Sequence, residues 1–162
     1  MNQSPAERQI EAFLAKYSEV LAHQIRGARC LLREMFSQGH ELVFDNYNAL
    51  VFAFSPTERS ADAFLSVAGF PRWDNIFFSR GVELDDPVGL LQGTGSRVRS
   101  IRLQAPEQIS EPAVQALIFH AMEPHREALA QAESLRTTIN SVSVSQRSRR
   151  ADSMTKKVKN AR

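Results

Sequence analysis

Cysteine is nearly absent from this sequence: Cys30 is the one thiol among 162 residues. A single cysteine excludes an intramolecular disulfide, which favours a reducing compartment, so the cytoplasm is the predicted location. Cys30 falls near the apolar positions of the first predicted helix, and we expect a small buried side chain there. A nucleophilic role would require a nearby base, and the sequence indicates none.

Long hydrophobic runs are also absent. The longest, residues 49–54, is far shorter than the roughly 20 apolar residues that cross a bilayer. The amino-terminal residues show no basic start followed by an apolar block, so no secretory signal is predicted. We therefore expect no membrane partner.

Patterns typical of metal binding or catalysis are missing as well. The four histidines are His23, His40, His120 and His125. His120 and His125 lie five residues apart with Pro124 between them, so they do not share a helix face at the spacing of zinc-binding helices. We predict no metal, no cofactor and no catalytic residue, and we favour a non-enzymatic function.

Acidic side chains are scarce at the carboxyl-terminal end of the chain. Residues 133–162 hold eight basic side chains against two acidic ones, a net charge of +6. The full sequence holds 20 basic and 18 acidic residues, so residues 1–132 hold 12 and 16, a net charge of −4. The positive charge of the chain therefore belongs to its last segment, and the body is mildly acidic.

The last segment is also poor in apolar residues. Residues 137–146 are polar and rich in serine, and the basic residues that follow have almost no apolar neighbours. Such a segment cannot bury enough surface to offset its ordering entropy, so we predict a disordered tail over residues 133–162. Its charge would support weak, salt-dependent contact with nucleic acid, but it lacks aromatic residues that stack on single strands. A solubilising tail is an equally good interpretation.

The body begins with a helical pattern. Ser4, Pro5 and Glu7 have the form of a capping box, and apolar residues recur at helical spacing from Ile10 to Phe36. This predicts one long helix, with Gly27 as a candidate break because glycine costs about 1 kcal/mol in a helix interior. A second helix is predicted to begin near residues 110–112 and to end or kink at Pro124.

Between the two helices the texture is that of β-strands. The predicted strands cover residues 42–44, 50–54, 63–68, 75–78 and 97–103. Residues 45–48 have the chemistry of a hairpin turn between the first two strands. Short turns between consecutive strands favour an antiparallel sheet, so we predict a two-layer α+β domain over residues 1–132 with about five mainly antiparallel strands.

Residues 41–122 also carry a series of motifs in a fixed order. They are residues 44–50 (FDNYNAL), 56–59 (PTER), 70–78 (FPRWDNIFF), 84–95 (LDDPVGLLQGTG) and 97–103 (RVRSIRL). With these motifs the chain resembles the bacterial YdhG-like family of domains of unknown function. The resemblance implies a compact α+β fold with a helix before the sheet and one after it, and no established activity for most members. At least one relative is described as a frataxin-like intracellular iron chaperone, which supplies an alternative function.

An iron chaperone would need carboxylates gathered on an exposed surface, because hard cations prefer oxygen ligands. The nearest candidate is the small cluster of Glu83, Asp85 and Asp86, which lies beside a proline turn. The first predicted helix instead interleaves acidic residues with basic ones, which departs from that requirement.

Two groups of residues are candidates for ligand binding. Gly93 and Gly95, followed by Arg97 and Arg99, form the nearest match to a phosphate-binding loop. This loop leads into a strand and not into a helix, so it differs from a P-loop, and a tight turn is the plainer interpretation.

The second group is aromatic. Tyr47, Trp73, Asn75 and Arg99 would line a cleft at one end of the sheet, with Trp73 as a stacking platform. The plainer interpretation of Trp73 is packing at the edge of the core. The sequence therefore predicts a small binding or interaction module of unassigned activity, with a small anionic ligand, nucleic acid or a second copy of the chain as candidate partners.

Overall fold

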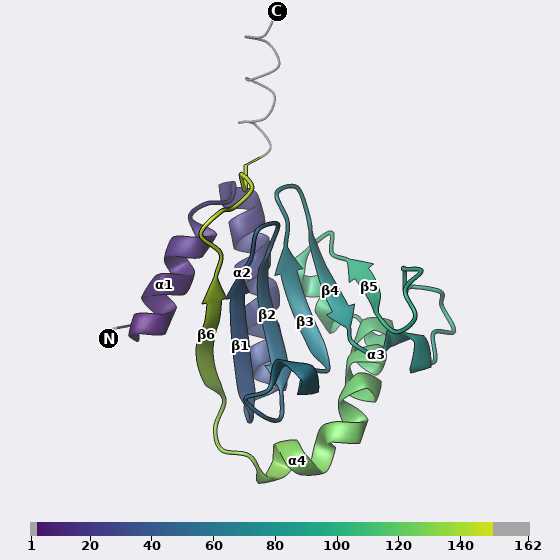
Figure 1. Cartoon of the computed structure of the whole chain (residues 1–162). Helices are drawn as coiled ribbons and strands as arrows, with labels where there is room; N and C mark the ends of the chain where they lie inside the picture. Colours follow the sequence, from purple (N-terminus) through teal and green to yellow (C-terminus); the bar gives the residue numbers. More distant parts are fainter. Residues whose placement is uncertain (1–2, 151–162) are drawn as a thin grey trace, which may run out of the picture.

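The structure is a computed structural model that describes residues 3–150. A six-stranded sheet in the order β5-β4-β3-β2-β1-β6 forms one layer, and helices form the other (Figure 1). The elements are α1 (Pro5–Leu14), α2 (Glu19–Met35), β1 (His40–Asp45), β2 (Leu50–Ser55), β3 (Leu65–Gly69), β4 (Asp74–Phe78), β5 (Arg99–Arg102), α3 (Pro112–Met122), α4 (Arg126–Gln131) and β6 (Arg136–Val142). The predicted α+β class is confirmed. The sheet has six strands and is mixed, because β6 runs parallel to β1 while the other neighbours are antiparallel.

The core lies between the sheet and the helices on one of its faces. Alternate strand residues such as Val43, Phe52 and Ile76 are buried against apolar side chains of α2 and α3. In Figure 1, α2 runs behind β1 and β2. The other alternate residues of each strand point to the opposite face, which we call the open face. None of the described helices within residues 3–150 is long and apolar enough to cross a membrane.

The amino-terminal helical pattern is two helices and not one. α1 ends at Leu14, and Ser18 caps α2 by accepting a hydrogen bond from the Leu21 amide. Between them the Tyr17 hydroxyl is buried, where it donates to the Gly69 carbonyl and accepts from the Leu50 amide. Burial raises the pKa of Tyr17 to about 12, so the hydroxyl stays protonated and pins the break to the sheet.

Gly27 is not the break that the sequence suggested. It lies inside α2, where a Cβ atom would come within 2.8 Å of the Pro106 ring. The glycine therefore permits close packing of the segment before α3 against α2. The predicted end of the second helix is confirmed, since α3 stops at Met122, just before Pro124.

The prediction of a disordered tail is wrong for residues 136–150. These residues include β6, in which Thr137 donates a hydrogen bond to the Glu41 carboxylate of β1 and Ile139 packs against the core. The edge of β1 is therefore covered by β6. The following arm, residues 143–150, crosses the β1–β2 turn. It is held there by hydrogen bonds from the Ser143 amide to the Asp45 carbonyl and from the Arg147 amide to the Tyr47 carbonyl. These specific partners outweigh the unfavourable composition. The rest of the predicted tail, residues 151–162, lies outside the described residues.

Candidate anion-binding site

The predicted aromatic group lies partly together. The β1–β2 turn and the β3–β4 turn meet at one end of the sheet because Leu50 pairs with Gly69, and we call this the turn end. Tyr47 and Trp73 lie in these two turns and are both exposed. Asn75 is nearby on the open face of β4, where its Nδ2 contacts Ser100 and its buried Oδ1 has no hydrogen-bond partner. Arg99 lies on β5 and does not join this group.

The glycine loop is closed by its own arginine. Gly93 has a positive φ of 132°, a conformation that favours glycine. The Arg99 guanidinium donates to the carbonyl oxygens of Gly95 and Val98. The loop therefore presents carbonyls to an internal cation, whereas a phosphate-binding loop presents N–H groups to an external anion.

A cavity at the turn end has the cationic lining that the glycine loop lacks. This tryptophan pocket has a volume of about 590 Å³ and lies where α2 begins, β3 turns into β4 and β5 ends. It is lined by Ser18, Val20, Leu21, Gln24, Pro71, Arg72, Trp73, Arg102, Leu103, Gln104 and Arg150. Three arginines from separate segments line it, and none of its lining residues within residues 3–150 is Asp or Glu.

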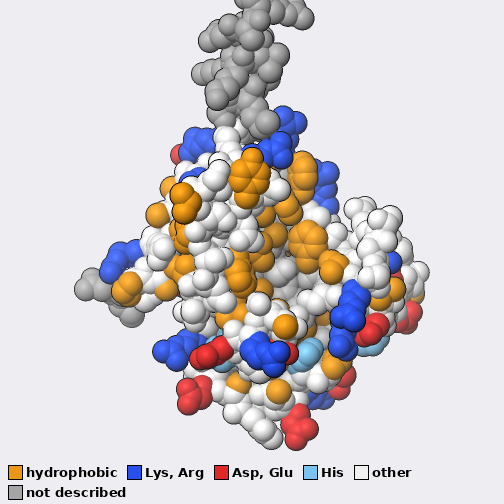
Figure 2. All heavy atoms as spheres, in the orientation of Figure 1, with side chains coloured by type: hydrophobic (Ala, Val, Ile, Leu, Met, Phe, Trp, Pro, Cys, Tyr) orange, Lys and Arg blue, Asp and Glu red, His pale blue; other side chains and the backbone are white. Residues whose placement is uncertain are grey.

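The arginines and Trp73 form a cationic, planar surface. The Arg102 guanidinium lies 4.5 Å from the centre of the Trp73 ring, whose residue is 37% exposed. Arg72 and Arg102 form no ion pair with a carboxylate of residues 3–150. Arg150 donates to the carbonyls of Ala15 and Lys16, so the carboxyl-terminal arm is anchored at the pocket. Figure 2 shows Lys and Arg side chains at this upper end of the molecule.

Gln24 connects the pocket to a buried acid. Its Nε2 donates to Asp74 Oδ1 and to the Leu103 carbonyl. Asp74 is fully buried, its Oδ2 has no hydrogen-bond partner, and burial raises the pKa of its carboxyl to about 6. A folded-state pKa above the ordinary value of 3.8 means that the folded protein holds this proton more tightly than the unfolded chain does.

Because of Asp74, the free energy of unfolding should decrease as the pH rises. Its contribution should fall as the pH rises from about 4 to about 6 and then level off, by about 3 kcal/mol in total. Asp74→Asn removes the charge, so the free energy of unfolding of the variant should rise relative to that of the wild type across this interval. Denaturant unfolding at several pH values measures the difference, with the exposed Asp85→Asn as control. Parallel profiles for wild type and Asp74→Asn would contradict the assignment.

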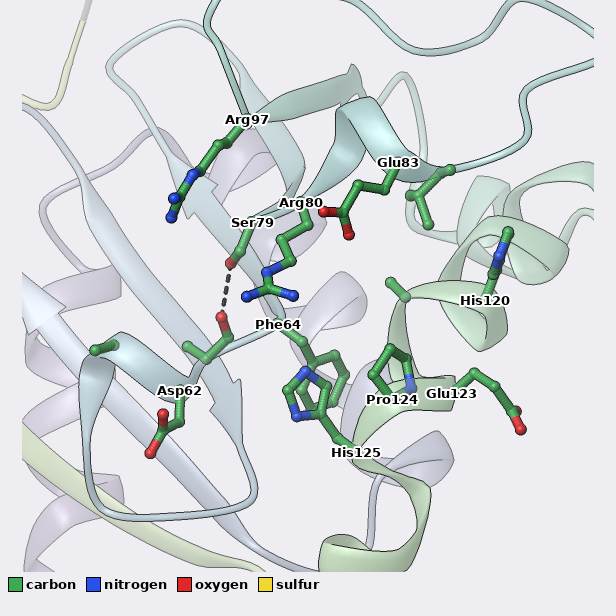
Figure 3. A pocket seen from close by; sticks show the side chains of 14 residues that line it. Asp62, Phe64, Ser79, Arg80, Glu83, Arg97, His120, Glu123, Pro124 and His125 are labelled. Atoms are coloured by element: carbon green, nitrogen blue, oxygen red, sulfur yellow. Dashed lines mark hydrogen bonds between the residues drawn. The ribbon is translucent and has the colours of Figure 1, made fainter.

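Arg97 lies in another cavity, which we call the lateral cavity. It has a volume of about 490 Å³ and lies between the segment after β4, the β2–β3 connection and the end of α3 (Figure 3). Arg80 and Arg97 line it together with Asp62, Glu83 and Glu123, so its charges are of both signs. Burial, with a smaller effect of Arg80, lowers the pKa of His125, which stacks on Phe64 at 5.2 Å.

The other sequence candidates have structural roles or no shared site. Cys30 is exposed and not buried as expected, because it lies on the outer face of α2. The Asp86 carboxylate accepts hydrogen bonds from the amides of Leu90 and Leu91, which closes the turn before the glycine loop. Residues 3–150 contain no group of three or more His, Cys, Asp or Glu side chains that could hold a metal ion.

Sequence reasoning placed Trp73 in a site but missed most of its neighbours. Arg72 precedes it directly and could have been included from the sequence. Arg102 could be identified as a neighbour only from the register of β4 with β5, in which Asn75 pairs with Arg102. Arg150 was assigned to the tail and excluded. Comparison of the chain with protein-family models, with curated proteins and with solved structures gives no match.

Proposed function

We propose that this chain is a binding module whose tryptophan pocket takes a small ligand that joins a planar aromatic ring to an anionic group. A nucleoside monophosphate is the simplest ligand of this class. The observation that carries the proposal is the convergence of Arg72, Arg102 and Arg150 around an exposed tryptophan, with no carboxylate from residues 3–150 in the lining. A base can stack on the indole or on a guanidinium plane, and the remaining arginines can bind the phosphate.

The lateral cavity supports this proposal less well. Arg80 and Arg97 are the cations that would bind an anion there, but three carboxylates line the same space. Like charges would repel an anionic ligand at short range. Three arginines line the tryptophan pocket, and Asp74, which Gln24 contacts, is buried.

Three alternatives are also proposals: a YdhG-like domain, an iron chaperone and a nucleic-acid-binding protein. Membership of the YdhG-like family agrees with the α+β class. A frataxin-like iron chaperone would bind Fe(II) or Fe(III) in calorimetry at physiological salt, and a failure to bind would reject it. Nucleic-acid contact through basic residues of the last segment would be weakened in a variant with Lys156→Gln, Lys157→Gln and Lys159→Gln.

Calorimetric titration of the full-length protein tests the pocket. Adenosine monophosphate should bind more tightly than either adenosine or inorganic phosphate, because only the nucleotide uses both the aromatic surface and the arginines. Trp73→Ala and Arg72→Gln should each weaken binding by about tenfold, the size expected for one lost stacking or charged contact. Arg126→Gln is the matched charge control, because Arg126 is exposed on α4 and pairs only with the exposed Glu123.

Two results would reject the proposal. The first is binding of the nucleotide that is no tighter than binding of phosphate alone, since it would remove the aromatic half of the site. The second is an equal affinity for wild type and Trp73→Ala, since it would place the ligand elsewhere.

A further inference from the structure

The open face of the sheet continues from the tryptophan pocket as two rows of side chains. The row nearer the turn end contains Ser141, Phe44, Val51, Ala68, Asn75 and Arg102, which are neighbours in the strand register. The next row contains Thr138, Leu42, Ala53, Ser66, Phe77 and Ser100. In Figure 1 no α-helix lies in front of these rows, and the short 3-10 helix Ser60–Asp62 lies in front of the lower part of the sheet.

The rows place short side chains between two aromatic ones, and we call this strip of the open face the trough. Small or short side chains of β2 and β3 make its floor, and they are Val51, Ala53, Ser66 and Ala68. Phe44 on β1 and Phe77 on β4 stand on either side, three strand spacings or about 14 Å apart. Both rings are partly exposed and neither belongs to the buried core cluster. Between the two rings Val51 and Ser66 are partly exposed, whereas Ala53 and Ala68 are buried.

No acidic side chain of β1 or β4 lies on the open face. The three carboxylates of β1 and β4 are Glu41, Asp45 and Asp74, and all are buried on the helix side of the sheet. Neither row contains a carboxylate, and the first row ends at Arg102. Figure 2 shows apolar side chains over the sheet and Asp and Glu gathered mainly toward the lower end and the side.

We propose that the open face binds single-stranded nucleic acid, with one nucleotide in the tryptophan pocket and the next ones stacked along the trough. The proposal rests on the proposed function, because it extends the same ligand from a monomer to a polymer. Partly exposed aromatic rings on a sheet can stack unpaired bases, and neighbouring arginines can bind the phosphates. A duplex keeps its bases stacked inside and could not use Phe44 and Phe77.

Fluorescence anisotropy of a labelled uridine oligonucleotide of about 12 nucleotides tests this inference on the full-length protein. Phe44→Ala and Phe77→Ala should each weaken oligonucleotide binding by roughly 5- to 100-fold, the range for one lost base stack. Both variants should bind adenosine monophosphate as the wild type does, because neither residue lines the tryptophan pocket. Phe119→Ala is the matched control, since Phe119 is exposed on α3.

The arms of the experiment separate the open face from the other sources of binding. Arg102→Gln should weaken binding and lower the salt slope by about 0.7, the value for one lost phosphate contact on a single strand. A full-length variant with Lys156→Gln, Lys157→Gln and Lys159→Gln should still bind the oligonucleotide. Adding Phe77→Ala to it should weaken binding by the same factor as in the wild type. Loss of binding in that variant, with wild-type affinity in both phenylalanine variants, would overturn the inference in favour of the terminal segment.

Two further outcomes would overturn it. The first is equal affinity for single strands and duplexes of the same length. The second is a stable dimer in light scattering that Phe44→Ala and Phe77→Ala dissociate, because the open face would then bind a second copy of the chain. If the phenylalanine variants lose oligonucleotide binding and the wild type does not bind the mononucleotide, the pocket proposal fails and only the stacking of bases on Phe44 and Phe77 stands.

Discussion

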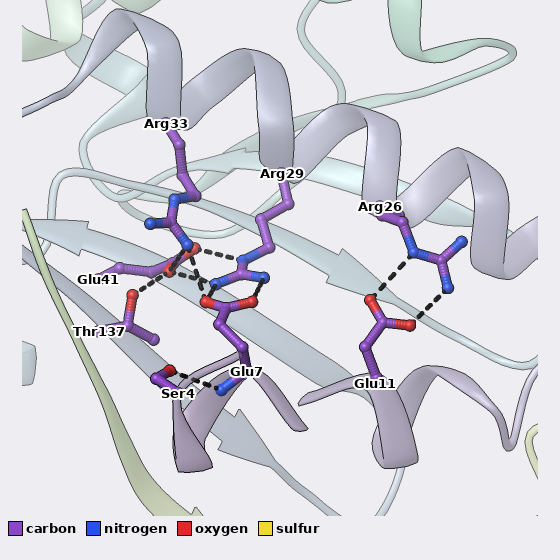
Figure 4. A network of polar contacts seen from close by, with 8 residues as sticks. All are labelled: Ser4, Glu7, Glu11, Arg26, Arg29, Arg33, Glu41 and Thr137. Atoms are coloured by element: carbon purple, nitrogen blue, oxygen red, sulfur yellow. Dashed lines mark hydrogen bonds and ion pairs between the residues drawn. The ribbon is translucent and has the colours of Figure 1, made fainter. Parts of the chain in front are cut away.

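Replacing Arg29 with methionine is expected to lower the free energy of unfolding by about 3–5 kcal/mol, because it leaves a buried carboxylate without its main partner. Arg29 Nε and Nη2 donate to Glu41 at 2.8 Å each, and the Glu41 side chain is fully buried. The same guanidinium donates to Glu7, which lowers the pKa of that carboxyl (Figure 4). These bonds join α1, α2 and β1, and Thr137 extends them to β6.

Arg26 provides a matched control on the same helix. It forms a two-bond pair with Glu11, also drawn in Figure 4, but the side chains are 46% and 39% exposed. Water screens such a pair, so Arg26→Met should cost no more than about 1 kcal/mol. Urea unfolding followed by circular dichroism measures both variants. Equal costs for Arg26 and Arg29 would show that burial does not determine the strength of these pairs.

Asp45→Asn is expected to have the second large effect, a loss of about 3–5 kcal/mol. The Asp45 carboxylate is 1% exposed and accepts from Lys16 at 2.7 Å and from Arg149 at 3.0 Å. Arg149 is itself buried, and its Nε and Nη1 have no hydrogen-bond partner within residues 3–150. Removing the only carboxylate paired with Arg149 in residues 3–150 therefore leaves a buried cation without a counterion.

The reverse substitution should cost less. In Arg149→Met, Asp45 keeps Lys16 and the amide of Gln146, so the expected loss is about 1–2 kcal/mol. Urea unfolding of Asp45→Asn, Arg149→Met and the double variant gives the coupling between them. If Arg149→Met were as damaging as Asp45→Asn, the arm would be held mainly by the arginine and not by the shared carboxylate.

Most of the sheet could be predicted from local sequence. The first four strands were expected within a few residues because their alternation and the turn at residues 45–48 are local signals. The break between α1 and α2 was missed because both helices carry an apolar face in nearly the same phase. Tyr17 fixes the break through hydrogen bonds to Gly69 and Leu50, which are distant in sequence.

The carboxyl-terminal strand and the site depend on long-range pairing. Thr137 and Arg149 find their partners on β1, about a hundred residues earlier in the chain, so composition alone predicted disorder. The same limit applies to the tryptophan pocket. Trp73 was identifiable as an aromatic candidate, but Arg102 and Arg150 reach it only through the strand register and the folded arm.

The central claim is that the tryptophan pocket binds an aromatic anion, and the chain offers a direct probe of it. Trp73 is the only tryptophan in the sequence, so the intrinsic tryptophan fluorescence reports on the pocket alone. Titration with adenosine monophosphate should quench this emission to a saturating limit, and Arg72→Gln should shift the midpoint to higher concentration by about tenfold. A change that stays linear in nucleotide concentration and is identical in Arg72→Gln would contradict the claim.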